Sequence, residues 1–190
     1  MAKAEIVRCP WSLRSPHETR YHDEEWGVPL HDDGRLFEFL VLESMQAGLS
    51  WNTILAKRDN FRRAFDSFDA KKVSRYGAAE RARLMSDASI VRNGMKIDAA
   101  INNATRFLEA QREFGSFDRY IWSFVDHRPM RNKFESQSQI PPKTPLSDKI
   151  SKDLKQRGFK FVGSTVIYAH MQATGMVNDH LVSCFRYRKV

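Results

Sequence analysis

The sequence predicts an all-α fold, and three observations support this prediction. Apolar residues recur at helical spacing, as at Leu36, Leu40 and Ala47. Alternating strand patterns are nearly absent, and glycine, proline, serine or aspartate separates the helical segments, where these residues cap or end helices. A chain of 190 residues most simply folds around one core, so we expect a single domain over 1–190.

The first half of the chain is predicted to be a loop followed by three helices. Residues 9–34 contain several prolines and glycines, which break helices. The pattern then predicts a buried helix that starts at Arg35 and ends near Gly48, a helix that Ser50 caps and that extends to Phe65, and a short helix capped by Asp69 or Ser67.

The second half alternates helices with turns. Two helices joined by a tight turn at 89–94, an aromatic-rich helix and two further helices are predicted over Ala79–Asp87, Lys96–Gln111, Phe117–Val125, Asp148–Gln156 and Gly163–Thr174. Ser147 is the expected cap of the fourth helix and Gly158 its end. Arg128–Pro145 is rich in proline and polar residues, so a surface loop is expected there.

The charge and the cysteine content exclude some classes of protein. The chain has 31 Lys plus Arg against 23 Asp plus Glu, a formal net charge of +8 and a sequence pI near 9.7. This balance suggests an anionic partner, most often nucleic acid, although many basic proteins are simply soluble. Two cysteines exclude a disulfide framework. No apolar run approaches the ~20 residues that span a bilayer, and the start has no apolar signal core, so we expect a cytoplasmic protein without a membrane segment.

Two pairs of potential metal ligands stand near the ends of the chain. Cys9 and His22 lie near the start, and His180 and Cys184 lie near the end. An i, i+4 spacing on a helix would point His180 and Cys184 to one side. Two thiolates and two imidazoles are typical ligands of one tetrahedral Zn²⁺, and four protein ligands leave no open position, so the ion would be structural. The alternative is two unrelated buried cysteines and two surface histidines.

Glu43 is the one acidic residue in the apolar stretch at 39–45. It shares a stripe with Leu36 and Leu40, where a carboxylate must be paired, hydrogen-bonded or neutralised. Aromatic residues flank it in the sequence: Trp11, Tyr21, Trp26 and Trp51. Flat aromatic walls around one acceptor would recognise a flat base that carries an amino group and a positive charge. The alternatives are a Glu43 bonded to a backbone amide or to an arginine, and aromatic residues that only pack in the core.

The turn at 89–94 carries positive charge at the start of the following helix. Backbone amides at a helix N-terminus attract phosphate, and Arg92 and Lys96 add charge beside them. Such a turn can hold a DNA backbone without reading its sequence. The alternative is an ordinary helical hairpin whose charges are solvated.

Several long motifs resemble one known family, the bacterial 3-methyladenine DNA glycosylases of type I. The resemblance extends from about Cys9 to Cys184, and motifs of this length make a chance match implausible. The motifs are Arg8-Cys9-Pro10-Trp11, Tyr21-His22-Asp23-Glu24-Glu25-Trp26-Gly27-Val28-Pro29, Leu36-Phe37-Glu38, Leu42-Glu43, Gln46-Ala47-Gly48-Leu49-Ser50-Trp51, Trp122-Ser123-Phe124-Val125, Arg157-Gly158-Phe159-Lys160-Phe161-Val162-Gly163 and Val177-Asn178-Asp179-His180.

The resemblance implies a helix-hairpin-helix DNA glycosylase fold in which one structural zinc ion ties the N- and C-terminal segments together. The implied zinc ligands are Cys9, His22, His180 and Cys184. The implied base pocket has Glu43 in contact with the extruded base and stacking walls from Trp11, Tyr21, Trp26 and Trp51. The implied DNA contacts are the turn with Arg92 and Lys96, and Gln46 and Leu49, which would fill the gap left in the duplex.

The activity implied is base excision from double-stranded DNA that contains alkylated bases. The protein would flip 3-methyladenine out of the duplex, hydrolyse its N-glycosidic bond with Glu43 as the catalytic group, and release the free base. No lysine lies in the pocket motifs, so no covalent lyase step is expected, and a monomer is expected.

The sequence departs from the family pattern at Glu18, where the family has a tyrosine, and at Ser89, where it has a glycine. Serine adopts a positive φ less easily than glycine. These departures favour the alternative, a zinc-stabilised module that binds damaged DNA without cleaving it.

Overall fold

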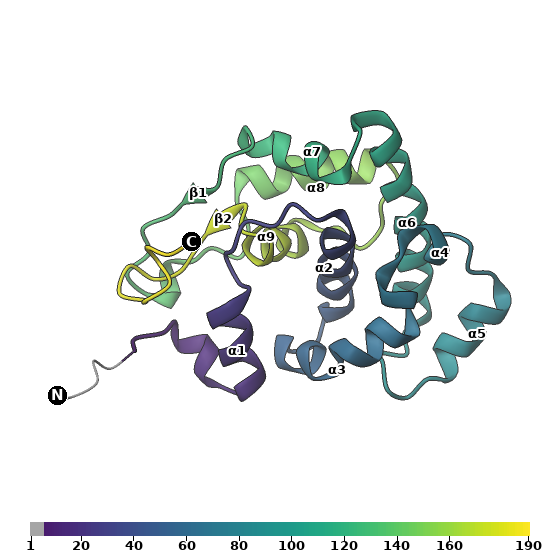
Figure 1. Cartoon of the computed structure of the whole chain (residues 1–190), viewed down its shortest axis with the longest axis horizontal. Coiled ribbons are helices and arrows are strands. Elements are labelled where there is room, and N and C mark those ends of the chain that lie inside the picture. The colour runs from purple at the N-terminus through teal and green to yellow at the C-terminus, as the bar shows by residue number, and fades with distance from the viewer. Residues whose placement is uncertain (1–5) are drawn as a thin grey trace.

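The computed structural model describes residues 6–190, and helices form almost all of its regular structure (Figure 1). The α-helices are α1 (Pro16–Glu24), α2 (Asp33–Gln46), α3 (Trp51–Ala64), α4 (Ala70–Val73), α5 (Ala78–Ser86), α6 (Gly94–Phe114), α7 (Phe117–Trp122), α8 (Pro145–Gln156) and α9 (Ser164–Ala173). Short 3-10 turns cover Pro10–Leu13, Asp66–Phe68, Ser123–Val125 and Gln137–Gln139. The two strands, β1 (Met130–Arg131) and β2 (Val177–Asn178), pair in parallel. The prediction of a mostly helical fold is confirmed.

Helix α2 lies at the centre of the molecule (Figure 1). Every residue from Leu36 to Met45 is buried, and the helix contacts α3, α6, α7 and α9. Apolar residues occur all round this helix, which suits a helix that other helices surround. Because α2 carries Glu43, the fold places a carboxylic acid inside the core.

Capping residues fix where the helices around α2 begin. Ser50 accepts a hydrogen bond from the amide of Thr53 (3.1 Å) at the start of α3, and Asp69 caps α4, as the sequence predicts. The prediction for α8 is wrong, because Ser147 lies inside the first turn and Thr144 is the cap. Pro145 takes the first helical position, where no amide hydrogen is needed, and this starts the helix earlier.

Two other predicted helices change their bounds. Helix α6 begins at Gly94, where the side chain of Asn93 accepts from the first turn, and it continues to Phe114 before Gly115 ends it with a φ of 87°. The aromatic-rich helix is shorter than predicted, because α7 ends at Trp122 and a 3-10 turn follows.

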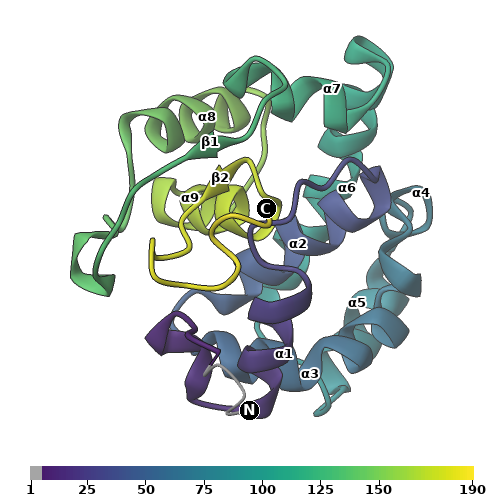
Figure 2. The same ribbon diagram turned by 60° about the vertical axis from the view of Figure 1, so that its left-hand side comes forward.

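The C-terminal segment returns to the N-terminal segment, and the two lie side by side in both views (Figure 1 and Figure 2). The amide of Phe185 donates to the carbonyl of Val7 (3.0 Å). The expected helix through His180 and Cys184 is wrong, since these residues form irregular turns after β2. The amide of His180 donates to the side chain of Asn178 (3.1 Å), which makes a local turn instead of a helical one.

Within residues 6–190, no helix is long and apolar enough to cross a membrane. The prediction about the start of the chain rests partly on residues 1–5, which lie outside the described residues.

Candidate active site and metal centre

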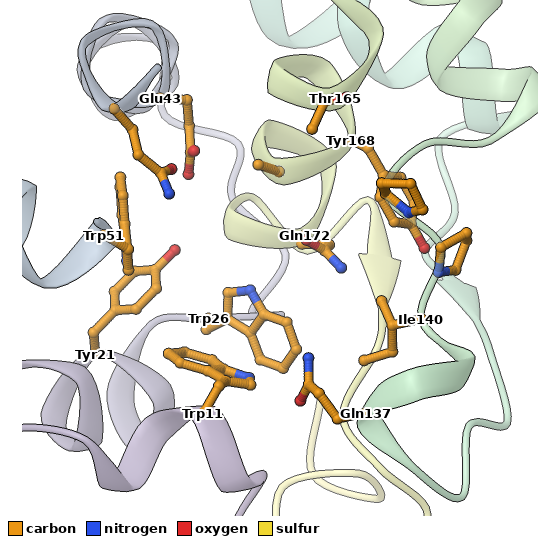
Figure 3. A pocket seen from close by; sticks show the side chains of 14 residues that line it. Trp11, Tyr21, Trp26, Glu43, Trp51, Gln137, Ile140, Thr165, Tyr168 and Gln172 are labelled. Atoms are coloured by element: carbon orange, nitrogen blue, oxygen red, sulfur yellow. The ribbon is translucent and has the colours of Figure 1, made fainter. Parts of the chain in front are cut away.

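A cavity of about 330 Å³ lies between the N-terminal helices and α9 (Figure 3). The first wall comes from α1, α2, α3 and the turn before α1, and the second from α9 and the loop at 137–142. The lining residues are Trp11, Tyr21, Trp26, Glu43, Gln46, Trp51, Gln137, Ile140, Pro141, Pro142, Thr165, Tyr168, Ala169 and Gln172. The fold therefore brings the predicted acid and all the predicted aromatic residues into one pocket.

The aromatic side chains form flat, tilted walls. The rings of Tyr21 and Trp51 lie 5.4 Å apart, and those of Trp11 and Trp26 lie 5.0 Å apart, edge to face. Tyr21 is buried, and burial raises its pKa well above the usual value, so the side chain stays a neutral phenol. Walls of this kind suit a flat, apolar or cationic ring.

Glu43 points into this pocket with its carboxyl group free (Figure 3). It is 4% exposed, and within residues 6–190 it has no ion-pair or hydrogen-bond partner. Burial alone raises its pKa to about 8. The alternatives of an arginine pair and of a backbone hydrogen bond are therefore wrong. With a pKa near 8 the acid is mostly protonated at neutral pH, and a cation beside it would favour its ionised form.

A buried arginine holds the helices that carry these residues. Arg58 of α3 donates to Glu38 of α2 (2.7 Å) and to Glu25 at the end of α1 (2.8 Å). Its guanidinium also lies over the ring of Phe39, 5.0 Å from the centroid. These contacts fix α1 and α3 relative to α2, and thereby the aromatic walls relative to Glu43.

The second wall of the pocket was missed by sequence reasoning. Arg128–Pro145 was predicted only as a surface loop, but Ile140 and Pro141 line the cavity. Tyr168 and Gln172 stand four residues apart in α9 and face the cavity together. The available signal was weak, because α9 also contains Ser164, Thr165 and His170, so a polar pair at helical spacing does not stand out there.

The four predicted metal ligands meet in one buried cluster. One ligand atom from each of Cys9, His22, His180 and Cys184 lies within 4.8 Å of the others. His22 Nε2 and His180 Nδ1 are 3.2 Å apart, and Cys184 Sγ lies 3.4 Å and 3.6 Å from these nitrogens. A tetrahedral zinc site with Zn–N near 2.0 Å and Zn–S near 2.3 Å separates its ligand atoms by roughly 3.3–3.8 Å. The cluster therefore has the size of such a site.

Neighbouring groups orient these ligands. His22 Nδ1 lies 2.8 Å from Asp23 Oδ1, and His180 Nε2 lies 3.0 Å from the carbonyl oxygen of Trp26. Each imidazole therefore donates its N–H outward and turns its free nitrogen to the centre, as metal-binding histidines do. The amide of Leu181 also donates to the Cys9 sulfur (3.4 Å), which favours a thiolate.

The turn between α2 and α3 lies at the pocket and is open to solvent. Gln46 lines the cavity, while Leu49 is 41% exposed. Gly48 has a φ of 78°, a conformation that suits glycine and makes the sharp turn possible. An exposed apolar side chain beside a pocket can contact a ligand larger than the pocket itself.

The hairpin between α5 and α6 is held in place from α3. Lys57 Nζ donates to the carbonyl of Ser89 (3.0 Å). At the start of α6, the amides of Gly94 and Met95 have no acceptor within residues 6–190, so they are available to an anion. Arg92 lies just before them and forms no ion pair in the described part of the chain.

Lys96 does not lie where the predicted phosphate contact requires it. It is 6% exposed, and its Nζ donates to the carbonyls of Met45 (2.8 Å) and Ala47 (2.5 Å) at the end of α2. Burial lowers its pKa. The prediction that Lys96 contacts DNA is wrong, because the buried ammonium group instead satisfies orphan carbonyls at the C-terminal end of α2.

Neither of the two residues that depart from the family pattern lines the pocket, so position 18 does not supply the aromatic wall that a tyrosine there implies. Glu18 is buried in α1 beside its cap Ser15, whose hydroxyl lies 3.5 Å from the carboxylate, and it does not line the cavity. Ser89 does not have a positive φ, so it carries no strain of the kind expected.

Comparison with known proteins finds one family over nearly the whole chain. A family model described as methyladenine glycosylase matches residues 11–187. DNA-3-methyladenine glycosylase 1 of Escherichia coli (strain K12) is 47% identical over 182 residues, which cover 96% of this chain and 97% of that protein.

The solved structures that match this chain are of the same family. A structure of 3-methyladenine DNA glycosylase I from Staphylococcus aureus matches with a TM-score of 0.91 at 37% identity, covering 95% of this chain and 96% of that one. A variant of 3-methyladenine DNA glycosylase I in complex with 3-methyladenine matches with a TM-score of 0.92 at 36% identity, covering 95% and 97%.

Proposed function

The chain belongs to the methyladenine glycosylase family, and from this premise we propose that it excises 3-methyladenine from DNA as an N-glycosylase. The observation that carries the proposal is Glu43, a buried acid without a protein partner in residues 6–190, set between aromatic walls. A pocket of this kind favours a flat base that brings its own positive charge. Glu18 replaces one aromatic residue of the family pattern, but Trp11, Tyr21, Trp26 and Trp51 still line the pocket around Glu43, which supports excision over a module that binds without catalysis.

The chemistry requires little beyond recognition of the cation. Methylation at N3 gives the base a positive charge and makes it a good leaving group, and departure leaves an oxocarbenium-like sugar that water attacks. The ionised Glu43 accepts a hydrogen bond from the exocyclic amine and favours the cationic ring. Stacking and cation–π attraction from rings such as Tyr21 and Trp51 add about 1–2 kcal/mol each where the cation is desolvated. Glu43 is therefore the catalytic group.

Duplex DNA lies across the pocket mouth and the hairpin. The amides at the start of α6 bind a phosphate, with Arg92 beside them, and α5 and α6 act as a helix-hairpin-helix unit. Gln46 and Leu49 enter the gap that the extruded nucleotide leaves. The exposed Leu49 and the free amides of Gly94 and Met95 support this placement.

One structural Zn²⁺ bound by Cys9, His22, His180 and Cys184 ties the two ends of the chain into a single domain over 1–190. The ligand separations and the outward hydrogen bonds of both histidines support this assignment. Four protein ligands leave no position for water, so the ion stabilises the fold and takes no part in catalysis. The protein acts as a monomer on double-stranded DNA.

The test is incubation of the protein with N-methylated duplex DNA and analysis of what is released. The proposal predicts free 3-methyladenine and an abasic site, with the strand intact until alkali is added. Binding to methylated or abasic DNA without any release of a base would overturn it.

A further inference from the structure

Gln172 lies on the second wall of the pocket, across from Glu43 (Figure 3). It belongs to α9 and lies between Trp26 and Tyr168 in this view. An amide side chain has a donor end and an acceptor end, and which end faces a ligand decides what it recognises. The surrounding hydrogen bonds fix this choice.

The residue behind Gln172 is Asp179, which is 1% exposed. Its Oδ2 accepts hydrogen bonds from Gln172 Nε2 (2.7 Å) and from the hydroxyl of Tyr168 (2.5 Å), and its Oδ1 accepts from Asn132 Nδ2 (2.6 Å). Burial, together with the hydrogen bond to Asp179, raises the pKa of Tyr168, so this phenol keeps its proton and donates. Three donors converge on a carboxylate, which offers only acceptors.

The carboxylate therefore fixes the polarity of the amide. If the Gln172 amide were turned over, its oxygen would face the acidic oxygen of Asp179, and both groups would lose a hydrogen bond in a buried place. Nε2 must point to Asp179, which leaves Oε1 as the free end. Within residues 6–190, Gln172 Oε1 has no hydrogen-bond donor, and the protein does not close it off from the cavity.

We propose that Gln172 Oε1 is a second hydrogen-bond acceptor for the extruded base, so that Gln172 is a specificity residue of the pocket. This inference rests on the proposed function. An exocyclic amine carries two N–H donors, of which Glu43 takes one and Gln172 takes the other. A base with a carbonyl oxygen in that position would set two acceptors against each other and would be rejected.

The two acceptors have different roles. Glu43 is mostly protonated in the empty pocket at neutral pH, since its pKa is about 8, and it becomes a full acceptor only when a cation enters. Gln172 has no titratable group, so the hydrogen bond to Asp179, and not the charge of the base, sets which end of its amide faces the cavity. Glu43 thus responds to the charge of the base, and Gln172 to its amino group.

The experiment is titration of the zinc-loaded protein with free 3-methyladenine, followed by quenching of tryptophan fluorescence, since three tryptophans line the pocket. Gln172→Met keeps the size of the side chain and removes the acceptor, and it should weaken binding about 10-fold. Asn132→Ala is the matched control, because it removes a different donor from Asp179 and leaves Gln172 in place. We expect it to bind 3-methyladenine as the wild type does.

Three results would overturn the inference. The first is binding of the free base by Gln172→Met with wild-type affinity. The second is loss of excision alone in Gln172→Met, which would place the oxygen on water or sugar. The third is equal weakening of binding by Asn132→Ala, which would make the effect structural. Failure of the wild type to bind or release 3-methyladenine would instead overturn the proposed function. Measurement of the wild type beside the variants separates failure of the proposed function, which the wild type shows, from failure of the inference, which only the variants show.

Discussion

At the scale of single residues, burial is the physical cause of most of the chemistry in the pocket. A glutamate side chain has an ordinary pKa of 4.5, but burial among the surrounding helices raises the pKa of Glu43 to about 8. No cation in residues 6–190 pairs with it. A group kept in this state costs stability whenever it ionises. A cationic ligand in the pocket would offset this loss of stability by pairing with the ionised Glu43.

This cost predicts a pH dependence of stability. The pKa of Glu43 is about 8 in the folded chain against 4.5 as its ordinary value, so between these values the folded state binds the proton and the unfolded state does not. The stabilising contribution of the neutral acid is complete below pH 4.5 and is lost as the pH rises to about 8, by up to about 5 kcal/mol. Glu43→Gln lacks this loss.

The measurement is urea unfolding of the wild type and of Glu43→Gln at pH 5, 7 and 9. The wild type should lose stability relative to the variant as the pH rises. A constant difference across this range would show that Glu43 is already ionised at pH 5.

The sequence predicts those pocket residues that stand out from their neighbours in the chain, and it does not predict those that reach the pocket from distant segments. Glu43 stands out because a carboxylate interrupts an apolar stripe, and the aromatic residues lie near it in the chain. Gln172 and Ile140 reach the pocket only through the return of distant segments, which no local pattern encodes. Lys96 was misplaced because a positive charge beside a turn was taken to be exposed.

At the scale of elements, Lys96 joins the hairpin to the pocket. Its backbone belongs to the first turn of α6, and its ammonium group binds the last carbonyls of α2, one turn beyond Glu43. The proposed phosphate contact and the proposed gap-filling turn therefore share one buried connection. This connection sets the distance between the place where DNA is held and the place where the base enters.

Substitution of Lys96 by Met should impair work on DNA more than recognition of the base. Removing the ammonium group leaves the buried carbonyl of Met45 and the part-buried carbonyl of Ala47 without this donor, at a cost of about 1–3 kcal/mol, and loosens the turn at 46–50. We expect kcat/KM on methylated duplex DNA to fall at least 10-fold, while binding of free 3-methyladenine stays within about 2-fold. The comparison variant is Lys57→Met, which loses only contacts to hairpin carbonyls. A loss of free-base binding in Lys96→Met as large as its loss of kcat/KM would contradict this role.

Arg58 should contribute strongly to stability through the three N-terminal helices. Arg58→Met leaves the buried Glu38 without its nearest cation and is expected to cost about 3 kcal/mol, measured by urea unfolding. Arg20→Met breaks an exposed pair with Glu24 and should leave the unfolding midpoint unchanged. Equal effects of the two substitutions would show that the Arg58 contacts add nothing beyond a surface ion pair.

The order of the helices from α2 onward follows from the sequence, because their ends are set by neighbours within a turn or two. Ser50 and Asp69 illustrate this, since each meets its partner amide within three residues. The loop expected over 9–34 is wrong, because Ser15 caps α1 and Pro16 takes its first position, where proline starts a helix instead of breaking one. The helix expected through His180 and Cys184 failed because pairing with β1 and a turn at Asn178 override the spacing. The four Cys and His residues still meet, because the C-terminal segment returns to the segment that precedes α1.

Over the whole molecule, the cluster of Cys9, His22, His180 and Cys184, where zinc is proposed to bind, closes the fold. Residues from both ends of the chain meet in it. The ring centroids of the pocket residue Trp11 and of His22 are 5.6 Å apart, and those of Trp26 and His180 are 4.6 Å apart. Loss of the ion would leave two thiols and two imidazoles buried without a cation, so the walls next to them would loosen.

Metal removal provides the corresponding prediction. The purified protein should contain zinc in a one-to-one ratio, and a strong chelator should lower its Tm, with recovery when zinc is returned. Cys184→Ser should show the low Tm without chelator. A Tm that is insensitive to the chelator in a protein that elemental analysis shows to be free of metal would contradict the zinc assignment.

Single-turnover release of 3-methyladenine from methylated duplex DNA measures how much Glu43 contributes to base excision in this pocket. With enzyme in excess and DNA fully bound, the wild type should release the base, and folded Glu43→Gln should do so about 100-fold more slowly. Release by Glu43→Gln at the wild-type rate would contradict the account.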